Sequence, residues 1–141
     1  MQTWIIYSLI SMLFTGVTAV IAKHGLKDIS SDLGVVVRTA AVLVFVVLNF
    51  FIFQSAKEIT NLSTKAIIFL VVSGLTTAVS WIFYYKAIKI GEISYVASID
   101  KSSILITIVL SYFFLSEPIT LKLVIGSVLI LAGLLVLTWK F

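Results

Sequence analysis

The chain has 141 residues, of which 61% are hydrophobic and 11% are charged, and its mean hydropathy is +1.22. This balance excludes an ordinary soluble globular domain, because too few polar residues remain to cover its surface. The net charge of +4 is spread mostly over short segments beside apolar stretches and does not indicate a nucleic-acid-binding surface, while the absence of cysteine excludes disulfides, thiolate chemistry and cysteine-based metal sites.

Five apolar stretches predict five transmembrane helices. Each one approaches or reaches the roughly 20 residues that cross a bilayer, and they cover residues 4–22, 35–53, 66–85, 94–115 and 123–139. The first stretch is not typical of a signal peptide, because no basic side chain precedes it and four more stretches follow. The sequence therefore predicts an all-α integral membrane protein with one domain over residues 1–141.

The connections between these helices differ in length. Residues 89–92 and 116–120 form connections so short that the third, fourth and fifth helices must be antiparallel neighbours. Pro118 is expected to open the fifth helix or the turn before it, because proline suits a first helical turn. The first and second connections, around residues 23–33 and 55–64, are longer and polar, and we expect ordinary surface connectors there.

The loop charges favour one orientation by a small margin. We name the N-terminal side of the membrane side A and the opposite side B. Lysine and arginine favour the cytoplasmic side of a membrane. Five loop lysines on side B against three on side A therefore predict that side B is cytoplasmic. The chain would then be an inner-membrane protein with its N-terminus outside the cytoplasm and its C-terminus in it. The side B lysines are Lys23, Lys27, Lys86, Lys89 and Lys140, and those of side A are Lys57, Lys65 and Lys122. So small a bias also permits insertion in both orientations.

Three charged residues lie inside the predicted spans and are the main candidates for a site. Arg38 lies in the second span, and Asp100 and Lys101 lie in the fourth. Arg38 and Asp100 have similar predicted depths, so an ion pair between them is geometrically plausible. Adjacent helical positions diverge by about 100°, so Lys101 is expected to need the headgroups, another acid or a ligand. Two interpretations follow: an ion pair that locks helices together, or a polar cavity for a substrate or coupling ion.

Small hydroxyl residues continue from these charges in a helical pattern. In the fourth span the stripe contains Asp100, Ser103, Thr107 and Ser111, and in the third it contains Ser73, Thr77, Ser80 and Tyr84. Such stripes are compatible with a lined passage, and equally with close packing of transmembrane helices. Small-residue positions predict helix packing or a dimer seam: Gly74 in the third span and Gly126 and Gly133 in the fifth.

Aromatic residues gather at the side B end of the third span. Trp81, Tyr84 and Tyr85 are either interfacial anchors, as most aromatics at this depth are, or an aromatic wall for a cationic or ring-bearing ligand. No metal cluster, phosphate-binding loop or catalytic set occurs in the sequence, and His24 is the only histidine. We therefore expect neither an enzyme nor a protein that needs a metal or cofactor.

An odd number of spans suggests half of a transporter, because many secondary transporters are built from two related halves. The segment WIFYYKAIKIGEISYVASIDKSSILITIVLSYFFL, with the following Ser116-Glu117-Pro118, resembles the EamA-type domain of the drug/metabolite transporter superfamily. Three shorter matches point to its single-domain, five-helix bacterial and archaeal group: Ala22-Lys23-His24-Gly25, Arg38-Thr39 and Ile99-Asp100-Lys101.

The resemblance implies a five-helix subunit that works as a dimer, since longer members look like two such domains fused in opposite orientations. It also implies transport of small metabolites or drugs, often outward. The chain departs from two-domain members, which commonly have a proline where Asp100 and Lys101 stand. It also lacks the first-helix glutamate of the small multidrug exporters, so proton coupling by that route is not expected.

The sequence thus predicts a secondary-type membrane transporter that exports a small metabolite or drug as a homodimer, antiparallel or parallel, with no nucleic-acid partner. Its polar centre is predicted around Arg38, Asp100 and Lys101, with Ser80, Trp81, Tyr84, Ser103 and Thr107 as further candidates. Two alternatives remain open. A flippase for lipids or lipid-linked precursors would hold an anionic headgroup with Lys23, Arg38 and Lys101, and an accessory subunit would use its charges to hold a partner chain.

Overall fold

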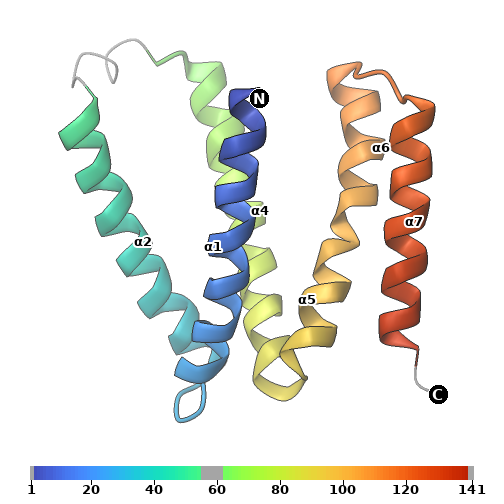
Figure 1. Ribbon diagram of the computed structural model, residues 1–141. Helices are drawn as coiled ribbons and strands as arrows, with labels where there is room; N and C mark the ends of the chain where they lie inside the picture. The colour runs from blue at the N-terminus through green and yellow to red at the C-terminus, as the bar shows by residue number, and fades with distance from the viewer. Residues whose placement is uncertain (1, 55–61, 140–141) are drawn as a thin grey trace. The chain divides into compact units, whose positions relative to one another are not determined.

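Helices form all five predicted spans. The computed structural model describes residues 2–54 and 62–139, and within these ranges every regular element is a helix (Figure 1). The helices are α1 (Thr3–Gly25), α2 (Ser31–Phe53), α4 (Thr64–Ile90), α5 (Ile93–Lys101), α6 (Ser103–Leu115) and α7 (Leu121–Thr138). Five spans are long and apolar enough to cross a membrane, with α5 and α6 together forming the fourth. The prediction of an all-α membrane protein is confirmed.

Several helices extend beyond the predicted stretches because polar residues at their ends stabilise them. The Ser30 side chain accepts a hydrogen bond from the Leu33 backbone N–H at 3.2 Å, so α2 begins four residues earlier than predicted. Lys23 and His24 lie in the last turn of α1, where positive charge complements the helix dipole. With 27 residues, α4 is about 40 Å long, at roughly 1.5 Å per residue.

The chain forms two compact units, and the first contains α1, α2 and α4. Its helices come together at the side B end, while α2 diverges from α1 toward the opposite end (Figure 1). A small core lies where α2 packs on α4, made of Leu26, Gly34, Tyr85 and Ile88. The predicted surface connector is a short, mostly exposed turn between α1 and α2, and Leu26, which is 2% exposed, returns from it to the core.

Two lysines tie the ends of α1 and α4 together. Lys23 Nζ donates to the carbonyl oxygens of Ile88 and Lys89, at the end of α4. Lys89 Nζ donates in return to three carbonyls directly after α1, those of Leu26, Lys27 (2.9 Å) and Ile29 (3.0 Å). Carbonyls at a helix C-terminus lack partners within the helix, and cations are favourable there. The exchange therefore holds the α1–α2 connection against α4.

Replacing Lys89 with methionine is expected to lower the free energy of unfolding by about 1–2 kcal/mol, because charged hydrogen bonds are lost at a partly solvated site. The control is Lys86→Met on the same helix. Lys86 forms an exposed ion pair with Asp32 at 3.6 Å, and losing such a pair costs less than about 1 kcal/mol. Unfolding in detergent, followed by circular dichroism, compares the two variants. Equal stability of both would contradict the capping role of Lys89.

The second unit, from residue 91 onward, contains α5, α6 and α7, with α5 packed on α7. The fourth span is interrupted at Ser102, where the Ser102 N–H donates to the Ile99 carbonyl and the Leu105 N–H to the Ser102 carbonyl, at 3.0 and 3.1 Å. These short-range bonds tighten the chain between α5 and α6. The sequence did not predict this break, because the segment contains neither proline nor glycine.

The connection from α6 to α7 contains the only proline. Ser116 ends α6 in the left-handed conformation, with a φ of 55°, and the Thr120 hydroxyl accepts from the Leu123 N–H at 3.3 Å to begin α7. Pro118 lies between them, so it belongs to the turn before the helix, which is one of the two predicted places. Lys57, Lys140 and most of the second predicted connector lie outside the described residues.

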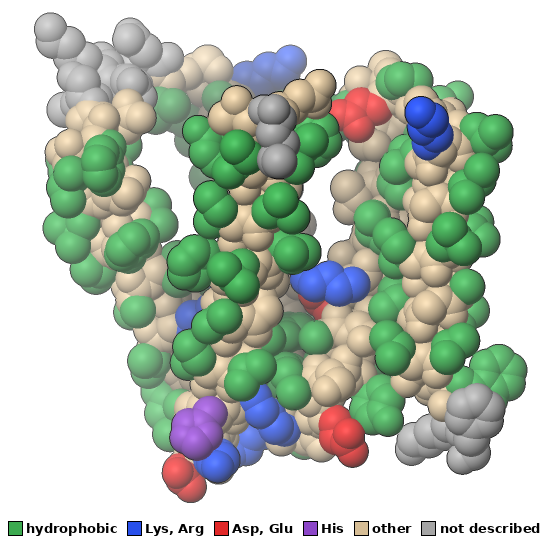
Figure 2. Space-filling model, viewed as in Figure 1, with side chains coloured by type: hydrophobic (Ala, Val, Ile, Leu, Met, Phe, Trp, Pro, Cys, Tyr) green, Lys and Arg blue, Asp and Glu red, His purple; other side chains and the backbone are tan. Residues whose placement is uncertain are grey.

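Large hydrophobic side chains are exposed along all five spans. Figure 2 shows hydrophobic side chains along the lengths of the helices in both units, while most charged side chains gather near helix ends. This pattern is the reverse of a soluble domain and fits helices whose outer faces meet lipid or another membrane chain.

Candidate functional site

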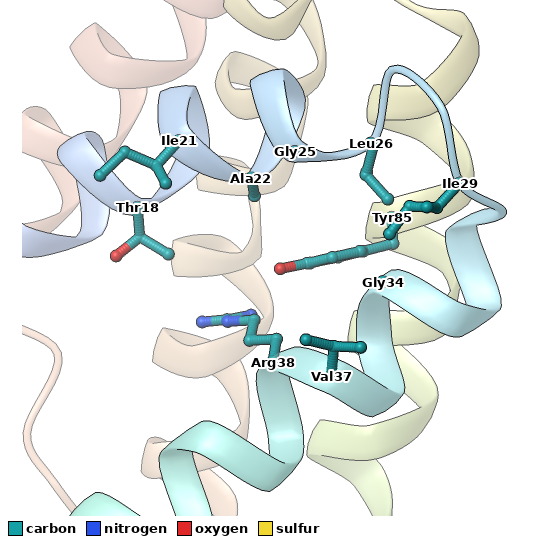
Figure 3. Close-up of a pocket in the computed structure, with 10 residues that line it drawn as sticks. All are labelled: Thr18, Ile21, Ala22, Gly25, Leu26, Ile29, Gly34, Val37, Arg38 and Tyr85. Atoms are coloured by element: carbon teal, nitrogen blue, oxygen red, sulfur yellow. The ribbon is translucent and has the colours of Figure 1, made fainter.

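A pocket of about 340 Å³ lies in the first unit, at the side B ends of its helices (Figure 3). Its walls come from α1, the α1–α2 connection, α2 and α4. The lining residues are Thr18, Ile21, Ala22, Gly25, Leu26, Ile29, Gly34, Val37, Arg38 and Tyr85. Arg38 is the one charged residue among them. Most of the other side chains are apolar, so the pocket combines a single cation with a hydrophobic surface.

Arg38 enters this pocket from α2 and is half-buried. Its guanidinium carbon lies 3.9 Å from the centre of the Trp81 ring and 5.7 Å from that of Tyr85. A guanidinium over an aromatic face is attracted by the ring quadrupole. Within the described part of the first unit, Arg38 has neither a carboxylate partner nor a hydrogen-bond acceptor. The two rings therefore support the cation but leave its N–H donors available.

The hydroxyl groups of Tyr85 and Thr18 accompany the guanidinium. Figure 3 shows the Tyr85 ring reaching across the pocket so that its hydroxyl and the Arg38 guanidinium point toward the side on which Thr18 lies. Tyr85 is 4% exposed, so the interpretation of this residue as an interfacial anchor is wrong. Trp81 carries the Arg38 guanidinium on its ring, so the cation there belongs to the chain itself. Its predicted role as an aromatic wall for a ligand stays a prediction.

Helical spacing explains why these residues meet. Gly34 and Arg38 are four residues apart on α2, and Trp81 and Tyr85 are four apart on α4, so each pair shares one helix face. A Cβ atom at Gly34 would collide with Leu26 Cδ2 and lie 3.3 Å from Tyr85 Cδ1. Glycine thus lets α2 approach α4 closely enough to place Arg38 over Trp81. The two spacings were visible in the sequence, and Tyr85 was among the aromatic candidates, but the contribution of Gly34 was missed.

The other two charged candidates form an ion pair with each other. Lys101 Nζ lies 3.5 Å from Asp100 Oδ2, next to the break after α5. The expectation that Lys101 needs a different partner is therefore wrong, because its flexible side chain curls back to the preceding residue. Arg38 belongs to the first unit and Asp100 to the second, so the ion pair predicted between them stays a prediction.

Some hydroxyl groups of the predicted stripes donate to carbonyl oxygens of their own helices. The Thr107 hydroxyl donates to the Ser103 carbonyl at 3.1 Å, and the Thr77 hydroxyl to the Ser73 carbonyl at 2.9 Å. Ser80 is exposed. The Thr107 hydroxyl keeps lone pairs for another donor. A role for Ser80, Ser103 and Thr107 in substrate binding stays a prediction.

Tyr84 and the three glycines lie outside the pocket lining. The Tyr84 ring tilts against Tyr85, with centroids 6.4 Å apart. A Cβ atom at Gly74, Gly126 or Gly133 would meet no atom within 4 Å, so no close approach among the described residues of either unit requires glycine there. Their assignment to a dimer seam stays a prediction.

Comparison with known proteins places the chain in a family. The model of the EamA-like transporter family matches residues 2–139. An uncharacterized transporter in the cobO 3′ region of a Sinorhizobium species is 33% identical over 136 residues, or 96% of each chain. An uncharacterized protein of Methanocaldococcus jannaschii is 29% identical over 138 residues, or 98% of each chain. No solved structure matches. The chain therefore belongs to the EamA-like transporter family and is a multi-pass membrane protein.

Proposed function

We propose that the chain is a secondary-type transporter that exports a small metabolite or drug, with the Arg38 pocket as part of its substrate path. The observation that carries the proposal is a half-buried guanidinium in a cavity of a protein from a transporter family. Arg38 lies two turns into α2, about 10 Å from its first residue at roughly 1.5 Å per residue. Charges at such depth are costly and mark substrate or ion pathways in membrane proteins.

The Asp100–Lys101 pair is proposed as a second polar element of the transporter. It lies at the junction of α5 and α6, and interrupted transmembrane helices commonly contribute to substrate or ion sites. Ser103 and Thr107, in the first turns of α6, add hydroxyl oxygens beside the break. We assign this element to substrate passage or ion coupling.

We further propose that two copies assemble into the working transporter. The two relatives named above align over nearly their whole lengths, so they too have the length of one five-span subunit. Exposed apolar helices leave ample surface for a second copy, and the open faces at Gly126 and Gly133 on α7 permit close approach. In the cysteine-free chain, single cysteines at Lys27 and Glu117 report orientation through an impermeant thiol reagent added to intact cells. Labelling of both supports an antiparallel dimer, and labelling of only one excludes it.

Release from vesicles tests the transport function. Vesicles containing the protein are loaded with small molecules extracted from the host cell, and the compounds that leave are identified by mass spectrometry. A limited set that leaves faster than from protein-free vesicles is expected. If no compound leaves faster, the chain is not a transporter on its own, and the accessory-subunit alternative replaces the proposal.

The flippase alternative is less well supported, because Lys23 is engaged by backbone carbonyls at the end of α4 rather than placed for a headgroup. Movement of a fluorescent lipid between leaflets separates the two functions: protein-dependent scrambling without release of soluble compounds would favour the flippase. The accessory alternative also loses one support, since Lys101 finds its partner on the neighbouring residue and not on another helix.

A further inference from the structure

We infer that the Arg38 pocket binds an oxyanion, a carboxylate or phosphate group, attached to a small apolar body. This inference rests on the proposed function and names the substrate class of the same site. Its starting point is the charge balance of the first unit. Asp32, one of its described acids, pairs with Lys86 at an exposed position, and no described acid of this unit pairs with Arg38.

A guanidinium carries five N–H donors in a planar fork that matches the two oxygens of a carboxylate or phosphate. The face of the Arg38 guanidinium is occupied by Trp81, which leaves the edge with its donors directed into the pocket. The hydroxyl groups of Tyr85 and Thr18 lie on the same side (Figure 3). An oxyanion is the ligand group that satisfies this set of donors.

The rest of the lining selects the body of the ligand. Ile21, Leu26, Ile29 and Val37 present apolar surface, and 340 Å³ is near the lower end of the range of about 300–1,000 Å³ for ligand pockets. An inorganic anion alone would leave this surface unused. An organic cation is disfavoured, since Arg38 would repel it with no described acid of this unit to offset the charge.

Trp81 provides a direct signal for binding. Substituting Trp4 and Trp139 with phenylalanine leaves Trp81, which stacks on Arg38, as the single tryptophan. In phosphatidylcholine nanodiscs the probes are hexyl phosphate and hexanoate, with neutral hexanamide and cationic hexylamine as matched controls. We expect a saturable change in Trp81 emission with at least one anion and none with the controls.

Variants of Arg38 test whether the change in Trp81 emission reports binding at Arg38. Arg38→Gln is expected to weaken anion binding about tenfold or more, and Arg38→Lys to weaken it less because the charge is kept. The control Lys27→Gln removes one charge from the same side of the membrane and is expected to keep the affinity. If Arg38→Gln does not fold, the comparison of Arg38→Lys with Lys27→Gln decides. An equal response to hexanamide, or unchanged affinity in both Arg38 variants, would overturn the inference.

The oxyanion has two possible sources, a free metabolite and a lipid headgroup. Adding phosphatidylglycerol to the nanodiscs distinguishes them. If this lipid changes Trp81 emission in an Arg38-dependent way and prevents hexyl phosphate from binding, the lipid headgroup is the source. If the lipid has no effect while hexyl phosphate binds, a free anion is the source. Both results support the oxyanion site. If the anions bind but no compound is released from vesicles, only the transport function is rejected. If neutral compounds are released and Arg38→Gln does not change the rate of their release, only this inference is rejected.

Discussion

Substituting Gly34 with alanine is expected to lower the free energy of unfolding by about 1–3 kcal/mol, because the added methyl group overpacks the contact between α2 and Leu26. The new Cβ would collide with Leu26 Cδ2, so the buried Leu26 side chain or α2 itself must shift. Tyr85 lies on the other side of the same position. Separation of α2 from α4 would also displace Arg38 from Trp81, so pocket binding should weaken together with stability.

The matched control is Gly16→Ala in α1, where a Cβ atom would meet nothing within 4 Å. Alanine is favoured over glycine inside a helix by about 0.5–1 kcal/mol, so this variant should be slightly more stable than the parent chain. Unfolding in detergent measures both changes. If Gly34→Ala also stabilises the protein, the close approach of α2 and α4 described here is incorrect. The double variant Leu26→Ala and Gly34→Ala should lose less free energy of unfolding than the sum of the losses of the two single variants, because the smaller side chain at position 26 removes the collision.

Arg38→Gln is expected to slow export of the transported compound by at least about 30-fold, since losing one member of a charged, hydrogen-bonded contact costs about 2–5 kcal/mol. The compound is the one identified by release from vesicles. Arg38→Lys should retain part of the rate, because it preserves the charge but not the planar fork. Lys27→Gln, at an exposed position of the same end, should transport at the parental rate. Parental rates in Arg38→Gln protein that is folded would remove Arg38 from the substrate path.

Hydropathy alone was sufficient to predict the five transmembrane spans, because a membrane helix requires mainly a local run of apolar residues. The helix ends were less predictable. Charged residues such as Lys23 and Asp32 were expected in loops, yet they suit helix termini and lie inside α1 and α2. The break at Ser102 was not predictable from composition, since no residue that commonly interrupts a helix occurs there.

The candidate site was predicted in part. Arg38 was identified because a charge in a span is conspicuous, and Trp81 because aromatics cluster near it. Their stacking could not be predicted, since it depends on which faces of α2 and α4 meet. That choice is made by Gly34, whose missing side chain leaves no hydropathy signal, and by Leu26, which returns to the core from a connection that appeared polar.

Protection of a cysteine inside the pocket tests most directly whether the Arg38 pocket is the substrate site. Thr18 lines the pocket and is half-buried, so Thr18→Cys introduces the only thiol of the chain at the site. The rate of its reaction with a water-soluble thiol reagent is measured in nanodiscs with and without the transported compound. The transported compound should slow labelling of the cysteine at position 18. It should not slow this labelling when the chain also carries Arg38→Gln. A cysteine placed instead at Lys27 should be labelled at the same rate with and without the compound. Equal labelling rates with and without the compound, at a concentration that saturates transport, would place the substrate site elsewhere.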